Sequence, residues 1–228
     1  MNRIMTPLLF GLLIATAVAP SAARAQTLLF DYVGFDYEFP DLNPAVFGDI
    51  GDGYQGVGEV PVLFAPLVSN HALNQYTYYF DGLTAAIRQT VGSFVIIDYS
   101  GPGTITLYED PILGGTAFDY GTNPPSGVAP PTFVDGIAIL VGKLTNFRYI
   151  INTANNTGSF EANFEAVGGS QLANIPVNQT LGWTFAGATG NSTTIPTGYD
   201  HQVDGQTFLE PPTSNRSGTW GAIKARYR

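Results

Sequence analysis

The chain of 228 residues has no cysteine, only two histidines and few charged side chains for its length. The absence of cysteine excludes a disulfide scaffold, a thiolate metal site, a cysteine nucleophile and a lipid anchor on an N-terminal cysteine. Two histidines are too few for a three-histidine zinc site, and no His-Glu-x-x-His, Gly-x-Ser-x-Gly or phosphate-binding glycine-loop pattern is present. The sequence therefore carries none of the common catalytic signatures.

Basic residues are also scarce, with nine Lys and Arg against 18 Asp and Glu. All the acidic residues lie between Asp31 and Glu210, and the bases within that span are Arg88, Lys143 and Arg148. Nucleic-acid binding by this body is disfavoured, because neutralising phosphates requires clustered Lys and Arg. An acidic surface instead suits cations or neutral partners such as glycans.

The N-terminus predicts an export signal. Arg3 supplies a positive start, residues 8–18 form a short apolar segment, and Ala23-Arg24-Ala25 is a small-x-small cleavage site. We therefore expect residues 1–25 to be removed and the protein to begin at Gln26 outside the cytoplasm, as an extracellular, cell-surface or periplasmic protein. A membrane anchor is the alternative, but neither this segment nor any later one reaches the roughly 18 apolar residues of a membrane span.

Beyond the signal, apolar side chains recur with the period of two that is typical of β-strands. Tyr76, Tyr78 and Phe80, for example, alternate with more polar positions. This pattern predicts about ten short strands, at residues 28–39, 58–67, 75–83, 94–97, 104–109, 137–141, 147–152, 159–167, 182–186 and 206–209. Asp81-Gly82 is expected as a turn and residues 155–158 as a hairpin loop. The single candidate for a helix is residues 83–91.

Short strands separated by Gly, Pro, Asn and Asp indicate an all-β fold, a single antiparallel β-sandwich of jelly-roll or immunoglobulin-like form. We expect this domain to cover residues 26–210. The proline-rich residues 123–132 are expected as a loop crossing between sheets, with a linker between two smaller domains as the alternative. Residues 211–228 form a Pro/Ser linker and a short basic aromatic tail. This tail is either an amphipathic helix that docks on a surface or on the acidic body, or a last edge strand.

One strand carries a pair of glutamates. Glu161, Asn163 and Glu165 share one face of it, and the opposite face carries Phe160, Ala162 and Phe164. This spacing resembles the Glu-x-Asp-x-Glu strand of the laminarinase-type glucanases, with Asn163 in place of the central Asp. The resemblance implies Glu161 as nucleophile and Glu165 as acid/base of a retaining glycoside hydrolase. The alternative is the solvated face of an ordinary half-buried strand.

Two loops offer oxygen ligands for calcium. Asp49 and Asp52 stand in a glycine-rich segment, and residues 200–205 hold a second pair of aspartates. Neither segment matches the twelve-residue calcium loop, and Asp-Gly is also ordinary turn chemistry. No cofactor is expected other than a structural calcium ion bound by Asp49 and Asp52.

The remaining site candidates are aromatic and polar residues that suit a sugar. Flat rings stack on pyranose faces while carboxylates bind hydroxyls. The ring candidates are Tyr78, Tyr79, Tyr99, Tyr108, Trp183 and Tyr199, and the candidate ligand-binding set is Trp183, Tyr199, Asp200, His201 and Asp204. Core packing is the alternative for the rings. For His201 the alternatives are a hydrogen-bonded loop histidine or a member of a Ser-His-Asp triad.

Together these observations predict an exported, non-catalytic surface, matrix or binding protein with affinity for glycans or for copies of itself. The alternative is an extracellular glycoside hydrolase that uses Glu161 and Glu165.

Overall fold

The fold comes from a computed structural model that describes residues 27–120, 131–192 and 194–209. Nine β-strands make up most of this part of the chain, and its only helical segments are three single-turn 3-10 helices. The strands are β1 (Thr27–Glu38), β2 (Gly53–Leu63), β3 (Asn74–Val91), β4 (Phe94–Ser100), β5 (Gly103–Pro111), β6 (Ile137–Asn152), β7 (Thr157–Gly168), β8 (Trp183–Gly190) and β9 (His201–Leu209), and the 3-10 helices are η1 (Pro131–Phe133), η2 (Leu172–Asn174) and η3 (Val177–Gln179).

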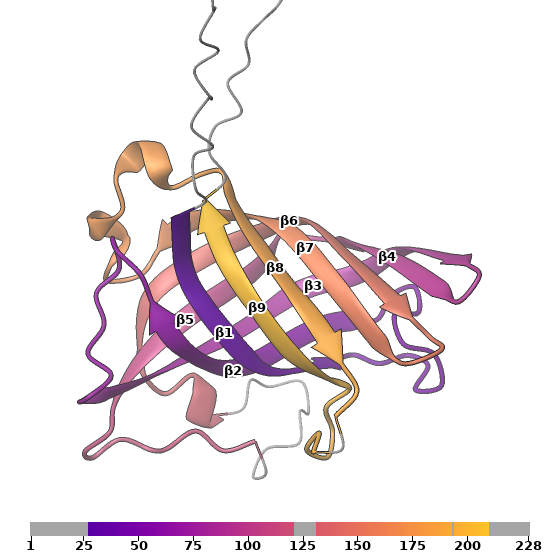
Figure 1. The fold of residues 1–228 in the computed structure, drawn as a ribbon, viewed down its shortest axis with the longest axis horizontal. Helices are drawn as coiled ribbons and strands as arrows, with labels where there is room; N and C mark the ends of the chain where they lie inside the picture. The colour runs from indigo at the N-terminus through magenta and orange to yellow at the C-terminus, as the bar shows by residue number, and fades with distance from the viewer. Residues whose placement is uncertain (1–26, 121–130, 193, 210–228) are drawn as a thin grey trace, which may run out of the picture.

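All nine strands belong to one antiparallel sheet that closes on itself, because β9 pairs with β1 and β2 pairs with β3 (Figure 1). Strands β4 and β5 both lie between β3 and β6. β5 pairs with the first half of β3 and β4 with its second half, so the two act as one long strand interrupted at Gly101-Pro102. Closing the sheet removes the long free edges at which another strand could add.

The structure confirms the all-β, antiparallel class predicted from the alternating pattern. Opposite sides of the closed sheet face each other across one core, and the sheet runs without a break from one side to the other. Apart from β4 and β5, which share the place between β3 and β6, neighbours around the sheet follow the order of the chain, as in a meander. The crossover connections of a jelly roll or an immunoglobulin domain are not found among the described strands.

The turn predicted at Asp81-Gly82 is instead a bend within strand β3. Asp81-Gly82 and the helical candidate at residues 83–91 both belong to β3, so both predictions are wrong. Gly82 has a φ of 78°, a conformation that glycine adopts without steric cost. The strand passes here from its partner β5, last paired at Asp81, to its partner β4, first paired at Thr84.

Strand β6 also joins two segments that were expected to be separate strands, residues 137–141 and 147–152. Its register against β7 shifts between Thr145 and Arg148, where Asn146 has a φ of 54°. Such a β-bulge bends a strand without ending it. The bend lets β6 follow the curvature of the closed sheet.

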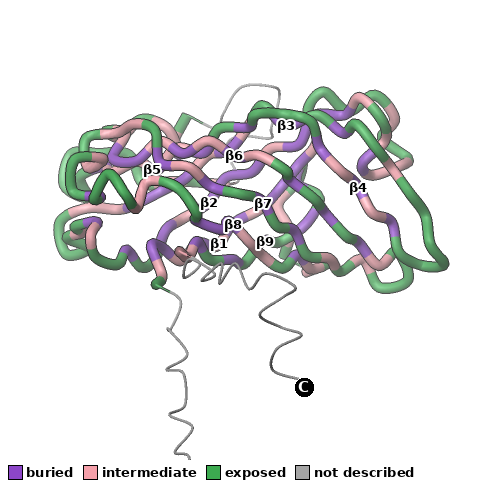
Figure 2. The backbone as a smooth tube through the Cα atoms, turned by 90° about the horizontal axis from the view of Figure 1, so that it is seen from above, coloured by how far each residue is buried: buried purple, intermediate pink, exposed green. Residues whose placement is uncertain are grey.

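Aromatic side chains fill the interior of the closed sheet. Tyr32 and Phe185 stack with ring centroids 4.7 Å apart, and Tyr78 meets Tyr32 edge to face at 5.2 Å. Figure 2 shows buried positions alternating with more exposed ones along the strands, the period of two on which the sequence prediction rested. The interior is therefore a packed core.

A second, smaller core lies outside the sheet over β1, β2 and β3. We call it the outer aromatic cluster: its buried members are Tyr37, Val57, Phe133 and Tyr199. The segments that follow β5 and β8 supply Phe133 and Tyr199, and the Thr77 hydroxyl of β3 donates a hydrogen bond to the Phe133 carbonyl at 2.8 Å. These segments cover the outer face of the sheet over β1, β2 and β3.

Several sequence predictions lie outside the described residues: the export signal at residues 1–25, the tail at residues 211–228 and most of the proline-rich loop at residues 123–132. Within the described ranges, the structure contains no helix that is long and apolar enough to cross a membrane.

Candidate functional site

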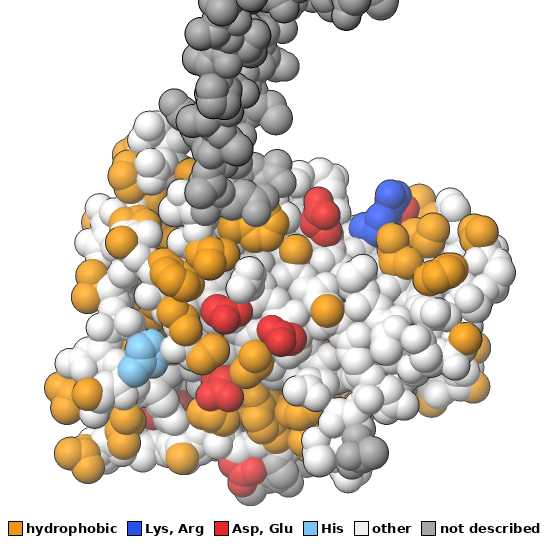
Figure 3. Space-filling model, in the orientation of Figure 1, with side chains coloured by type: hydrophobic (Ala, Val, Ile, Leu, Met, Phe, Trp, Pro, Cys, Tyr) orange, Lys and Arg blue, Asp and Glu red, His pale blue; other side chains and the backbone are white. Residues whose placement is uncertain are grey.

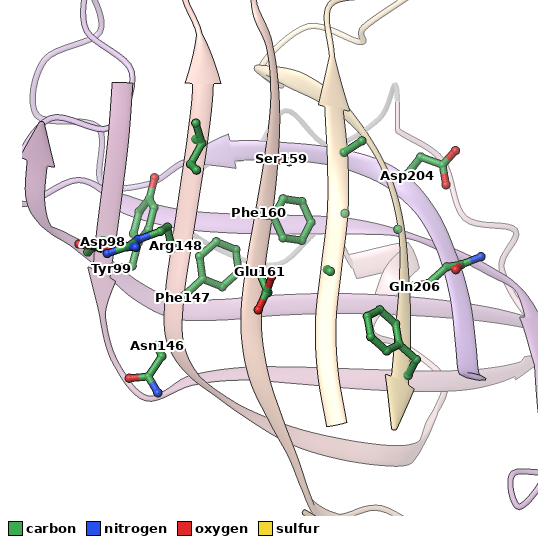
Figure 4. Close-up of a pocket in the computed structure, with 16 residues that line it drawn as sticks. Asp98, Tyr99, Asn146, Phe147, Arg148, Ser159, Phe160, Glu161, Asp204 and Gln206 are labelled. Atoms are coloured by element: carbon green, nitrogen blue, oxygen red, sulfur yellow. Dashed lines mark hydrogen bonds and ion pairs between the residues drawn. The ribbon is translucent and has the colours of Figure 1, made fainter. Parts of the chain in front are cut away.

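A broad hollow lies on a second part of the outer face of the sheet, across β4, β6, β7, β8 and β9. It has a volume of about 1030 Å³, and we call it the outer groove. Figure 4 shows the residues that line it, on neighbouring strands. Those that the argument uses are Asp98, Arg148, Glu161, Asp204, Gln206 and Phe208.

The groove exists because β8 has almost no side chains on its outer face. Ala186 and Ala188 present only methyl groups there, while the intervening Gly187 pairs with Gly205 of β9. Rings from the core occupy the inner side of both glycines: a Cβ on Gly187 would lie 2.6 Å from Phe160, and one on Gly205 would lie 2.3 Å from Tyr32. Longer side chains on the flanking strands then form the walls.

The walls of the groove carry hydrogen-bonding groups of both charges. Arg148 donates two hydrogen bonds to Asp98, at 2.6 and 3.0 Å, and these hold the pKa of Asp98 below its usual value. Glu161 stands opposite Arg148 in the register of β6 and β7, and Asp204 lies on the far wall. Three carboxylates against one guanidinium leave the groove acidic. Such a lining accepts hydrogen bonds from hydroxyl groups and repels anions.

Figure 3 shows that acidic groups are also more frequent than Lys and Arg on the surface around the groove. Acidic side chains are spread among uncharged atoms over the face that includes β1 and β9, and Lys or Arg side chains are visible on this side at one place.

A buried polar network lies at the end of the sheet where β1 leads into residues 39–52. Asp36 of β1 is 0% exposed and accepts hydrogen bonds from the Tyr54 hydroxyl at 2.8 Å and the His201 backbone N–H at 2.8 Å. The Nδ1 atom of His201 lies 3.1 Å from the same carboxylate. The network ties β1, β2 and β9 together inside the sheet.

His201 faces an oxygen at each ring nitrogen, because its Nε2 atom lies 3.3 Å from Oδ1 of Asn156. Burial lowers the pKa of His201, but the hydrogen bond and charge of Asp36, together with Asp200, raise it by more, so the pKa lies above its usual value. The second nitrogen meets an amide oxygen and not a hydroxyl. The geometry is therefore that of a buried ion pair, and no Ser-His-Asp triad forms around His201 among the described residues.

Asp200 lies at the rim of this network and accepts the Glu38 backbone N–H at 3.0 Å. Burial raises its pKa to about 6, with Asp36 adding to the effect and His201 opposing it. Asp200 and His201 thus lie together at the end of the sheet, whereas Asp204 lines the outer groove.

The other members of the predicted ligand-binding set are buried. Trp183 is 2% exposed and its indole N–H donates to the Gln179 carbonyl, while Tyr199 is 7% exposed within the outer aromatic cluster. Among the further ring candidates, Tyr78 and Tyr99 are buried, and Tyr79 donates a hydrogen bond from its hydroxyl to Gln55. These placements argue against a stacking platform made from Trp183, Tyr199, Tyr78 and Tyr99.

One of the two glutamates of β7 lies in the outer groove and the other lies outside it. Glu161 lines the groove, whereas Glu165 does not and stands opposite Lys143 of β6. Four residues of extended chain place their Cα atoms about 13 Å apart, so the two side chains would have to lean strongly toward each other to reach the roughly 5 to 5.5 Å between the carboxyl groups of a retaining pair.

Of the predicted calcium ligands, Asp52 is buried and accepts the backbone N–H groups of Leu42 and Asp49, at 2.8 and 2.9 Å. Its carboxylate groups with Glu38 and Asp41, and Asp49 is not a member of that group. The Asp49 carboxylate is instead held by the Asn43 side-chain amide at 3.0 Å, which lowers its pKa.

Sequence reasoning missed Asp36 and the outer groove as a whole. A signal for Asp36 was present, since it falls on the inward phase of β1 with Tyr32, where a charged residue needs a buried partner. A scan against models of protein families, a search of curated proteins and a search of solved structures each found no match for this chain.

Proposed function

We propose that the protein is an exported, non-catalytic carbohydrate-binding protein that holds a neutral polysaccharide in the outer groove. The observation that carries the proposal is the groove itself, whose methyl-and-glycine floor lies between walls of Asp98, Arg148, Glu161, Asp204 and Gln206. Sugar hydroxyls donate to carboxylates and accept from amides and guanidinium groups. The half-buried ring of Phe208 at one end supplies an apolar surface for a pyranose face.

The closed sheet favours a binding role over self-assembly by strand addition, because the strands already pair all the way around. The acidic lining favours an uncharged ligand over a nucleic acid or another polyanion. A groove of this size accommodates several sugar rings.

The proposal predicts that Gln206→Ala weakens polysaccharide binding about five- to tenfold, the effect of losing one hydrogen bond of about 1 kcal/mol. The measurement is migration of the purified protein in native gels that contain individual neutral polysaccharides. Gln89→Ala is the matched control, because Gln89 is exposed on β3 and does not line the groove. Equal retardation of both variants, or of neither, would remove the groove as the binding site.

A glycoside hydrolase is the second candidate, and Glu161 is the residue that favours it, since this carboxylate lines the groove. The same polysaccharides are assayed for reducing sugar with the native protein, Glu161→Gln and Glu165→Gln. We expect none to be released. Release that Glu161→Gln abolishes would replace the binding proposal with the enzymatic one.

The export proposal predicts that the protein recovered outside the cytoplasm begins at Gln26. N-terminal sequencing of that material checks it, and Met1 retained in a released form would contradict cleavage at this site.

A further inference from the structure

Three carboxylates meet at the junction between β1 and β2. Glu38 ends β1, Asp41 follows it, and Asp52 directly precedes β2. One oxygen from each lies within 4.8 Å of the others. Ligand oxygens around a calcium ion stand about 2.3 to 2.6 Å from it and hence no more than about 5 Å apart, so the three are spaced to share one ion. Asp52 is buried, Glu38 is half-buried and Asp41 is exposed, which leaves a path from solvent.

A second group lies at the same end of the sheet: Tyr99 of β4 pairs with Ala85 of β3, whose backbone N–H donates to the Asp52 carbonyl at 2.8 Å. Tyr99 of β4 is 6% exposed, and its hydroxyl oxygen is buried without a hydrogen-bond partner. Burial raises the pKa of this hydroxyl, and among the carboxylates that add to the effect Glu38 is the strongest, followed by Asp36 and Asp52. Buried hydroxyl groups are almost always satisfied, and an ion or an ion-bound water at the three carboxylates supplies the missing partner.

The charges around the cluster are unbalanced. Asp200 adjoins it through the Glu38 N–H, whereas the nearby cation His201 is already held by Asp36, and Arg88 acts on Asp49. The excess of negative charge at this point favours a bound cation.

We propose that Glu38, Asp41 and Asp52 form a calcium site and that the unpartnered Tyr99 hydroxyl completes it from the core. All the donors are oxygens, which suits a hard cation, and Ca²⁺ tolerates an irregular ligand set better than Mg²⁺ does. The ion fastens residues 39–52 to the end of the sheet, above the network of Asp36 and His201. Of the two ligands that the sequence suggested, Asp52 belongs to this set and Asp49 lies outside it.

The test is calorimetric titration of calcium chloride into the purified protein after chelator treatment, together with melting curves in calcium and in chelator. We expect one ion per chain and a melting temperature several degrees higher in calcium, because a ligand that binds only the native state stabilises it. Asp41→Asn is the informative variant. It keeps an oxygen to accept the Asn43 N–H, at 3.0 Å from Oδ1 of Asp41, but removes a ligand charge.

Asp41→Asn should weaken calcium binding about tenfold or more while leaving the melting temperature in chelator unchanged. Two charge-matched controls should bind as the native protein does: Asp49→Asn, which lies in the same loop, and Asp135→Asn, which is exposed just before β6. No saturable binding up to millimolar calcium would overturn the proposal, as would native affinity in Asp41→Asn or an equal stabilisation by magnesium. A loss of affinity in Asp49→Asn as large as that in Asp41→Asn would also overturn this ligand set.

Discussion

Replacing Asp36 with alanine is expected to lower the free energy of unfolding by about 3 to 5 kcal/mol, a large share of the roughly 5 to 15 kcal/mol that holds an ordinary domain together. Asp36 is 0% exposed and accepts from the Tyr54 hydroxyl and from the backbone and ring of His201. Its removal leaves those donors buried without an acceptor and leaves the imidazolium without its counter-charge.

Chemical denaturation of the native protein and of Asp36→Ala measures this difference directly. The control is Asp98→Ala, which also removes an aspartate from a pair with a basic side chain, but in a pair whose Arg148 side chain is 59% exposed. Exposed ion pairs contribute about 0 to 1 kcal/mol, so the control should stay close to the native protein. Similar losses in both variants would show that the buried network has no special role in stability.

The second large effect is expected at Gly34. Gly34 of β1 pairs directly with Gly58 of β2, and the Tyr78 ring lies over both. A Cβ added to Gly34 would lie 2.0 Å from the Val57 carbonyl oxygen and 2.7 Å from the Tyr78 hydroxyl. Backbone cannot yield as a flexible side chain does, so Gly34→Ala should cost about 3 kcal/mol or more.

The matched control is Gly190→Ala at the end of β8, where an added Cβ meets nothing within 4 Å. Its stability should stay within about 0.5 kcal/mol of the native value. Denaturation midpoints compare the two, and a Gly34→Ala protein as stable as Gly190→Ala would contradict the close approach of β1, β2 and β3.

The alternation of apolar residues was sufficient to predict the all-β class and the position of most strands, because each strand has one face in the core. It could not predict how the strands connect. Gly82 marks a turn by composition, yet the long β3 bends there and continues, because β4 and β5 together supply a full-length partner. That pairing depends on residues far along the chain, which a local pattern does not report.

For a related reason, the sequence did not show which of the candidate site residues lie together. Trp183 and Tyr199 carry side chains that suit sugar binding, but burial in the closed sheet and under its loops uses both for packing. The outer groove arises from what β8 lacks, namely long side chains at Ala186 and Ala188, and becomes a hollow only once β7 and β9 stand beside it. Asp204 and Glu161 were candidates because carboxylates are common ligand-binding and catalytic groups. Their shared location was not predictable.

The most direct test of the account is an NMR titration of the labelled protein with a soluble oligosaccharide from a polysaccharide that retards it in gels. The account predicts that amide shifts change at Ser159, Glu161, Gly187 and Gln206, which line the groove on three neighbouring strands, with the sugar left uncleaved. Shifts gathered instead over the outer aromatic cluster or around residues 39–52, or cleavage of the sugar during the titration, would contradict it.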